Sequence, residues 1–174
     1  MIKDFSLLAT TMRGTERQAS NELDFLLQKI GDSQPTICRT GIRGLITAKT
    51  SLNPVEAVDK LRQILNNYPY EFRYTMRIIP IEKVVRTDIE EIRVASAAMG
   101  AQIAEAEKFR ITVEKRFTAL SSKTIIEEAA KEIKRQVDLS KPDRILLIEV
   151  VGEFTGLSLI KPNGVLAVLK EKAL

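Results

Sequence analysis

Apolar and polar residues alternate along the first 80 residues in blocks that predict strands and helices in turn. Runs rich in apolar and β-branched residues predict four strands, at residues 5–12, 36–40, 45–50 and 72–79. Apolar residues at helical spacing predict one helix after Arg13-Gly14 and another after Asn53-Pro54. The order strand, helix, strand, strand, helix, strand is the split βαβ pattern of ferredoxin-like domains. We therefore expect residues 1–80 to place two helices on one face of a four-stranded antiparallel sheet.

Polar residues mark the expected helix starts. Asn53 followed by Pro54 and Glu56 combines a cap, a proline at the first helical position and a capping-box acid. Two further capping boxes are predicted, at Thr15 with Gln18 and at Thr87 with Glu90.

The second half predicts a connector, two helices and three strands, which gives an α+β chain whose second domain spans residues 84–174. The connector is expected at residues 81–87, and a helix is expected from Thr87 to about Glu107. Gly100 lies inside that helix at a cost of about 1 kcal/mol relative to alanine. The small residues around it would let another element pack closely, but an ordinary alanine-rich helix is at least as good an interpretation. Strands are expected at residues 109–116, 145–151 and 154–160. A helix capped by Ser122 or Thr124, with an apolar stripe reaching Val137, is expected after the first of them.

Composition permits a polyanionic partner without requiring one. The net charge is +4, with 27 Lys and Arg against 23 Asp and Glu. Residues 1–80 and 109–174 are net basic, and residues 81–108 between them are net acidic. The position of each cation therefore matters more than the total.

Several function classes are excluded or disfavoured by what the sequence lacks. It has no histidine and a single cysteine, Cys38, so neither a Cys/His metal site nor an intramolecular disulfide can form. No signal peptide and no apolar run of about 20 residues is present. We therefore expect a soluble, cytoplasmic protein that does not associate with a membrane and uses no cofactor.

An independent active site is also not expected. The sequence contains no Gly-rich phosphate loop, nucleophile elbow or His-based dyad. Glu149 and Glu153 could supply acid–base chemistry, but a charged residue at a strand edge or turn is the favoured interpretation.

Cations at the ends of predicted strands and helices form the candidate RNA-binding set. Lys115 and Arg116 end a strand, and Lys123 begins the next helix, where exposed N–H groups and the helix dipole favour a phosphate. In the second half the set comprises Arg110, Lys115, Arg116, Lys123 and Lys161. Solubilising charge is the alternative interpretation, and it is favoured for Lys131, Lys134 and Arg135 along the helix. Aromatic residues are only 5% of the chain and none is placed as a stacking pair, so contact through phosphates is expected.

Arg13 is the candidate in the first half. Arg13-Gly14 precedes a helix N-terminus and could receive a phosphate. A simple β–α turn is an equally good interpretation.

The motifs of the second half resemble the THUMP domain of tRNA-modifying enzymes over about residues 84–174. The matching runs are Phe109-x-Ile111-x-Val113-x-x-Arg116, then Val137-Asp138-Leu139-x-x-Pro142-Asp143, then Leu147-Ile148-Glu149-Val150. The first half is similar to the ferredoxin-like domain that usually precedes THUMP. Family members join THUMP to a methyltransferase, thiolation or deaminase domain, and the absence of such a domain from this sequence points to the stand-alone branch. The run from Gly152 to Ile160 resembles that branch, the adaptors of a separate RNA cytidine acetyltransferase.

The resemblance implies recognition of the tRNA acceptor end, with Arg116 as the basic contact after the first strand. The leading hypothesis is a non-catalytic tRNA-binding adaptor that assists an RNA cytidine acetyltransferase in tRNA acetylation, in a source that is prokaryotic and more specifically archaeal. A small-ligand-sensing regulatory protein built of α+β modules is the alternative, and an enzyme acting on RNA is a third hypothesis.

Overall fold

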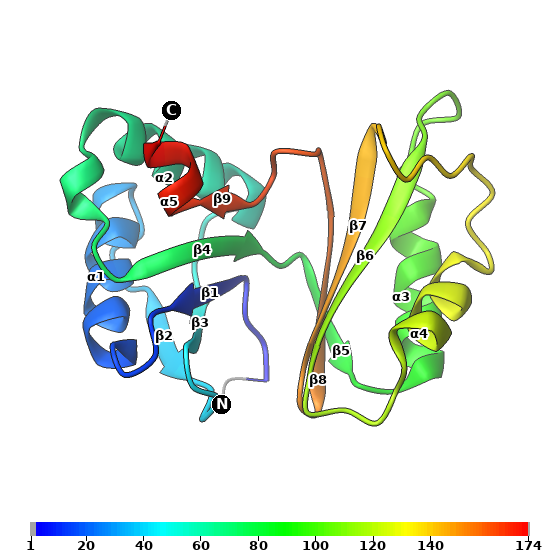
Figure 1. The fold of residues 1–174 in the computed structure, drawn as a ribbon, viewed down its shortest axis with the longest axis horizontal. Helices are drawn as coiled ribbons and strands as arrows, with labels where there is room; N and C mark the ends of the chain where they lie inside the picture. The colour runs from blue at the N-terminus through cyan, green and yellow to red at the C-terminus, as the bar shows by residue number, and fades with distance from the viewer. Residues whose placement is uncertain (1–2, 174) are drawn as a thin grey trace. The chain divides into compact units, whose positions relative to one another are not determined.

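The computed structural model describes residues 3–173, which divide into two compact units, each an α+β structure built on one sheet (Figure 1). The first unit comprises residues 3–81 together with residues 164–173, and the second comprises residues 82–163. Among the described helices, none is long and apolar enough to cross a membrane.

The first unit contains the predicted succession of strands and helices. Its elements are β1 (Leu7–Thr11), α1 (Glu16–Lys29), β2 (Thr36–Arg39), β3 (Leu45–Lys49), α2 (Pro54–Asn67), a 3₁₀ turn (Pro69–Glu71), β4 (Thr75–Pro80), β9 (Leu166–Ala167) and α5 (Val168–Lys172). The strand order is β2-β3-β1-β4-β9, and every neighbouring pair is antiparallel. The order strand, helix, strand, strand, helix, strand that was predicted for residues 1–80 is therefore observed.

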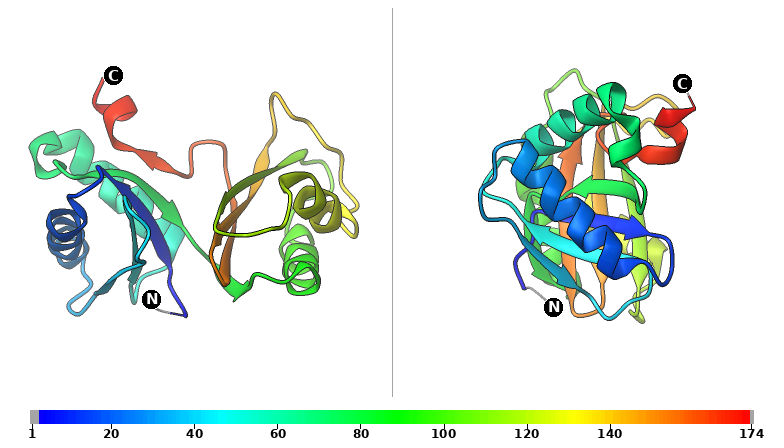
Figure 2. Two further views of the ribbon diagram at one scale, coloured as in Figure 1. Left: turned by 60° about the horizontal axis from the view of Figure 1, so that its bottom comes forward. Right: turned by 90° about the vertical axis from the view of Figure 1, so that its left-hand side faces the viewer.

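Two helices cover one face of this sheet, as the ribbon views show (Figures 1 and 2). Leu7 and Ala9 of β1 and Ile46 and Ala48 of β3 pack with the apolar faces of α1 and α2. These residues alternate along their strands, so the period-2 pattern of the sequence places them together. Most of the apolar core of the first unit lies in this layer.

The end of the chain completes the first unit. β9 pairs with β4 through Ile78 and Leu166, and both Leu166 and Val168 belong to the same buried cluster. Arg62 of α2 donates to the Glu171 carboxylate at 2.6 Å. The second domain was expected to span residues 84–174, whereas residues 164–173 pack with the first unit.

The second unit is a mixed sheet with two helices on one face (Figure 1). Its elements are β5 (Lys83–Arg86), α3 (Ile89–Gly100), β6 (Phe109–Arg116), α4 (Ser122–Ala130), β7 (Arg144–Val151) and β8 (Phe154–Ile160). The order is β5-β8-β7-β6, with β6 parallel to β7 and the other pairs antiparallel. Phe109 of β6 and Leu146, Ile148 and Val150 of β7 pack with α3 and α4.

A strand replaces part of the expected connector at residues 81–87. Lys83–Arg86 pairs with β8 at the edge of the sheet. Only Val84 and Val85 lie between its two charged ends, which is typical of a short edge strand and gives little alternation to detect.

Helix caps were predicted with mixed success. The Asn53 cap is confirmed, because its side chain accepts hydrogen bonds from the N–H groups of Val55 and Glu56. The Thr15 capping box is wrong: its hydroxyl donates to the Met12 carbonyl at 2.7 Å and makes no capping bond.

The caps of the second unit lie one residue from their predicted positions. Asp88, not Thr87, caps α3 by accepting from the Glu91 N–H at 3.0 Å. Ser121, in place of Ser122 or Thr124, caps α4 by accepting from the Thr124 N–H at 3.1 Å. In both cases a neighbouring side chain reaches the N–H group of the third helical residue.

Both helices of the second unit end earlier than expected, α3 at Gly100 and α4 at Ala130. A Cβ atom on Gly100 would lie 2.5 Å from Ile133 Cγ1, so the absence of a side chain there lets the segment after α4 pack against α3. The close approach that the small residues of this helix allow is thus observed at Gly100. Val137, expected on the helix stripe, instead forms an isolated parallel bridge with Phe109.

Candidate nucleic-acid interface

The corner between β6 and α4, defined as residues 115–123, gathers three of the six predicted cations. β6 ends at Arg116, a short loop follows, and Ser121 caps α4. Lys115 and Arg116 therefore lie at the strand end and Lys123 lies in the first turn of the helix. The predicted arrangement of a strand end beside a helix N-terminus is observed at this corner.

Two lysines of the corner are exposed. Lys115 Nζ donates to the Leu120 carbonyl at 3.2 Å, which holds the lysine against the loop. The Lys123 side chain is 85% exposed, and its nearest acid, Glu127, is 4.0 Å away. An exposed ion pair of this length contributes little, so both ammonium groups can contact an incoming phosphate.

Arg116 is held differently from the two lysines. Residues Phe109, Ile111 and Val113 face the helices, so Arg116 projects from the opposite face of the sheet. Its Nη1 donates to Glu149 Oε2 at 2.9 Å, and the Glu149 side chain is only 2% exposed. Arg116 thus holds a buried carboxylate in addition to any contact that it makes with a ligand.

Arg110 and Lys161 lie at the other end of the sheet. Arg110 pairs with Ile145, which in turn pairs with Ile160, the residue before Lys161. Over the length of β6, this end is roughly 20 Å from Arg116. Arg110 Nη1 donates to the Leu139 carbonyl at 3.0 Å. The predicted set of cations therefore separates into two groups within the second unit.

Phe117 is a residue of the corner that the sequence reasoning missed. Its side chain is 81% exposed, and its φ angle is +56°. Its position directly after Lys115-Arg116 is the one signal that could have singled it out. The backbone conformation that turns it to solvent is uncommon for a residue with a side chain, and nothing in the sequence indicates it.

The turn at Asp138 is stabilised by hydrogen bonds to its own side chain. The Asp138 carboxylate accepts from the N–H groups of Ser140 and Lys141, both at 3.0 Å. The hydrogen bonds from Lys141 and then Ser140 lower the pKa of this carboxyl. The turn leads into β7, next to the bridge between Val137 and Phe109.

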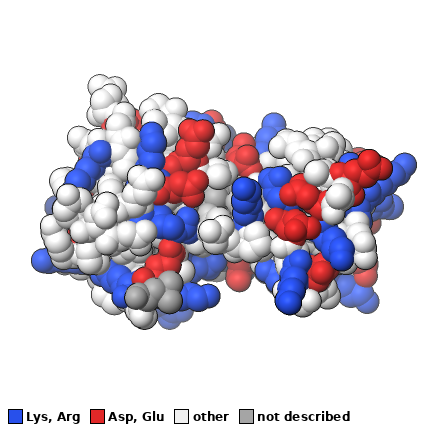
Figure 3. Space-filling view, turned by 90° about the horizontal axis from the view of Figure 1, so that it is seen from above, with Lys and Arg blue, Asp and Glu red and all other residues white. Residues whose placement is uncertain are grey.

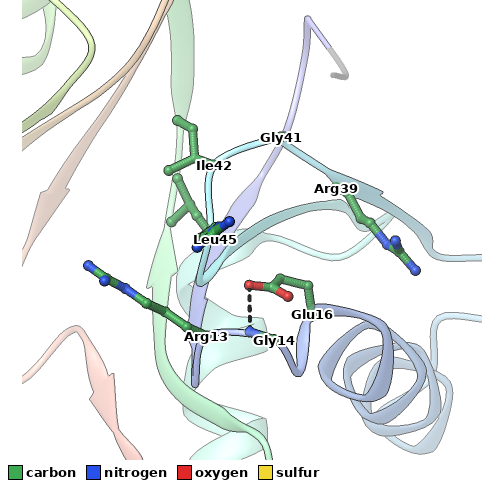
Figure 4. A pocket seen from close by; sticks show the side chains of 8 residues that line it. Arg13, Gly14, Glu16, Arg39, Gly41, Ile42 and Leu45 are labelled. Carbon is green, nitrogen blue, oxygen red and sulfur yellow. Dashed lines mark hydrogen bonds between the residues drawn. The ribbon is translucent and has the colours of Figure 1, made fainter.

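Arg13 lies on the rim of a hollow in the first unit, between the start of α1 and the β2–β3 turn (Figure 4). The hollow has a volume of about 530 Å³, and Arg39 and Arg43 also line it. In Figure 4 the Glu16 side chain points inward toward Gly14, whereas the side chains of Arg13 and Arg39 extend outward.

Glu16 joins the two turns that border this hollow through hydrogen bonds. Its carboxylate accepts from the Gly44 N–H at 2.6 Å and the Gly14 N–H at 3.2 Å. These bonds, with that from Gly44 the largest cause, lower the pKa of Glu16. Gly44 has a φ of +77°, and a Cβ there would lie 3.1 Å from the Thr11 carbonyl oxygen, so glycine is required at this turn. The rim of the hollow therefore carries three arginines, and the Glu16 carboxylate among them is held in place by hydrogen bonds.

Basic and acidic side chains are interspersed on the face drawn in Figure 3. An anionic ligand on that face would be bound by local groups of cations and not by one broad positive electrostatic potential. Among the described residues, no group of three or more Cys, His, Asp and Glu side chains is placed to hold a metal ion.

No protein-family model matches the sequence, and no curated protein is significantly similar to it. Solved structures share its fold at low identity. The protein PH1313 from Pyrococcus horikoshii has a TM-score of 0.63 and 20% identity, covering 91% of this chain and 55% of that one. TrmN from Thermus thermophilus has a TM-score of 0.57 and 16% identity, covering 90% of this chain and 45% of that one.

A 4-thiouridine synthetase, solved as an RNA complex with bound ATP, has a TM-score of 0.56 and 16% identity, covering 94% of this chain and 42% of that one. The chain thus spans about half the length of these structures. These likenesses support a THUMP-type fold, the fold that the sequence motifs resemble.

Proposed function

We propose that this chain binds the acceptor end of tRNA, catalyses no reaction itself, and serves as an adaptor for a separate RNA cytidine acetyltransferase. The corner between β6 and α4 is the observation on which the proposal rests. It places two exposed lysines at a strand end and a helix N-terminus, where the helix dipole adds to their charge. A group of this kind is suited to RNA phosphates.

The fold supports an RNA-binding role. One of the proteins that share it was solved with RNA bound, and the likeness extends over 94% of this chain. The assignment to the acetylation adaptors rests on the sequence run from Gly152 to Ile160. In this proposal the partner enzyme carries out the reaction that uses acetyl-CoA and ATP. This chain binds the tRNA and holds it in position.

The first unit completes the proposed adaptor. Its strand order β2-β3-β1-β4 with α1 and α2 on one face supports a ferredoxin-like assignment. Arg13, Arg39 and Arg43 around the α1 hollow would add phosphate contacts to those of the second unit. A cytoplasmic location and an archaeal source belong to the same proposal.

Binding of tRNA across a range of salt concentrations tests the RNA-binding part. Replacing Lys115 or Lys123 with Gln should weaken binding and reduce the slope of log affinity against log salt by about 1 for each lost phosphate contact. Lys134→Gln is the matched control, because Lys134 is an exposed lysine of the same unit outside the corner. Equal binding by all three variants and the unaltered chain would refute the site.

Reconstitution with the acetyltransferase tests the adaptor part. The partner enzyme should acetylate tRNA faster when this chain is present, and the Lys115→Gln and Lys123→Gln variants should stimulate it less. The chain alone, given acetyl-CoA, ATP and tRNA, should produce no acetylcytidine. Turnover by the isolated chain would support the enzyme hypothesis, and tight binding of a metabolite without preference for tRNA would support the sensor.

A further inference from the structure

Phe117 combines an uncommon backbone conformation with a side chain that is almost fully exposed to solvent. Among residues 3–173 it is the only non-glycine residue with a positive φ, at +56°. Its side chain is also the most exposed large hydrophobic one in the described chain, at 81%. Residues held in this region are strained, and such strain clusters at ligand-binding sites. Packing does not explain it, because the ring lies in solvent.

The loop on both sides of Phe117 is fixed by hydrogen bonds. The Arg116 carbonyl accepts from the Gly152 N–H at 2.9 Å. Beyond Phe117, the Thr118 hydroxyl accepts from the Leu120 N–H at 3.2 Å, and the Leu120 carbonyl accepts from Lys115 Nζ at 3.2 Å. The ring therefore projects from a preorganised frame.

Cations precede and follow Phe117 in the sequence. Lys115 and Arg116 precede it directly, and Lys123 follows in the first turn of α4. An exposed aromatic ring beside cations matches the chemistry of a nucleotide, which offers a flat base to the ring and a phosphate to the ammonium groups. A lipid surface or an apolar protein groove would call for a cluster of exposed apolar side chains, and Phe117 is the only exposed large hydrophobic residue of the corner.

We propose that Phe117 is a stacking platform for one unpaired base of the bound RNA. Stacking on the neighbouring base pairs covers both faces of a base inside a duplex, so the ring selects an unpaired, unstacked base. Together with the lysines, it would recognise an end where unpaired nucleotides leave a helix. This inference rests on the proposed RNA-binding function and adds the element that distinguishes an unpaired end from a duplex.

The test compares Phe117→Leu with Phe117→Tyr in the full chain. Leucine keeps an apolar side chain without a π-face, while tyrosine keeps the ring. The probes are a tRNA with its unpaired 3′ nucleotides and the same tRNA trimmed to a blunt end. Tyr70→Leu is the matched control, because Tyr70 is an aromatic residue of the first unit that is 65% exposed.

Stacking predicts that Phe117→Leu binds the complete tRNA roughly tenfold more weakly. Its affinity for the trimmed tRNA and its salt slope should stay unchanged, because no phosphate contact is lost. Phe117→Tyr and Tyr70→Leu should bind like the unaltered chain. A 2-aminopurine base at the 3′ end should be quenched on binding, and less so with Phe117→Leu.

Two results separate failure of this inference from failure of the function. If Phe117→Leu binds both RNAs normally while Lys115→Gln and Lys123→Gln bind weakly, the stacking role is overturned and RNA binding stands. If the unaltered chain does not bind tRNA, the proposed function fails first. Circular dichroism of each variant establishes that it is folded.

Discussion

Arg116 at the end of β6 is joined to Glu149 on β7 by an ion pair of 2.9 Å, in which the carboxylate side chain is 2% exposed and the arginine side chain is 19% exposed. The pair lies on the face of the sheet away from α3 and α4. The residue that the family resemblance singles out for RNA contact therefore also satisfies a buried charge. Removing it would affect the fold as well as binding.

Arg116→Ala should consequently destabilise the chain by about 3 kcal/mol, because it leaves the Glu149 carboxylate buried without this cation. Denaturant unfolding followed by circular dichroism measures the change. Lys115→Ala and Lys123→Ala are the controls and should shift the free energy of unfolding by less than about 0.5 kcal/mol. If Arg116→Ala unfolds like these two, the pair has no structural role, and loss of tRNA binding by that variant could be assigned to contact alone.

The sequence predicts elements well where periodicity or capping chemistry is local. β8 has its predicted bounds because Gly152 and Glu153 separate it from β7. β9 could not be predicted, because a strand of two residues is defined by its pairing with β4, which is distant in the sequence. β5 was missed for a related reason: two valines between charged ends do not reveal an edge strand.

The candidate site could be predicted only as a set of cations. Local reasoning identified Lys115 and Lys123, whose positions depend on a strand end and a helix start. It could not separate Lys161 from them, because that separation depends on the β6–β7–β8 register. It also missed Phe117, whose exposure follows from a backbone conformation that a phenylalanine rarely adopts.

Gly100→Ala should destabilise the second unit, although alanine is the better helix former by about 1 kcal/mol. The new Cβ would lie 2.5 Å from Ile133 Cγ1, so the segment after α4 must move. We expect a loss of about 1–2 kcal/mol in the free energy of unfolding. In a double-mutant cycle with Ile133→Ala, the combined loss should be smaller than the sum of the single losses. Additive losses would show that the two residues do not constrain each other.

The Asp32 carboxylate should make stability depend on pH. It is buried and accepts from the Thr50 hydroxyl at 2.7 Å and the Ser51 N–H at 3.1 Å. Although desolvation raises its pKa, these hydrogen bonds, led by that from Thr50, lower it overall below the ordinary value of 3.8. A depressed pKa means that the contribution is present above that value and is lost as pH falls through the folded-state pKa.

Asp32→Asn should therefore cost about 2 kcal/mol at pH 7 and progressively less as the pH is lowered toward 3. Unfolding in urea at several pH values measures the difference. Asp59→Asn is the control, because Asp59 is exposed on α2. A difference between the Asp32 variant and the unaltered chain that stays constant across this range would contradict the assignment.

Arg13 and Arg43 on the rim of the α1 hollow should contribute to tRNA binding through phosphates. Each replacement by Gln should weaken binding without regard to RNA sequence and lower the salt slope by about 1. Arg73→Gln provides the same chemical change at an exposed arginine of the first unit that does not line the hollow. If the rim variants keep the full salt slope, the hollow takes no part in RNA binding.

Leu166 and Leu169 test whether the end of the chain is part of the first unit. Leu166 is fully buried in the core beside β4, whereas Leu169, on the following helix α5, is 63% exposed. Leu166→Ala should cost about 2–4 kcal/mol, because it removes buried methyl groups and leaves a cavity. Leu169→Ala should change stability by less than about 0.5 kcal/mol. Thermal unfolding of both variants measures the difference: if Leu166→Ala is as mild as Leu169→Ala, β9 does not stabilise the first unit.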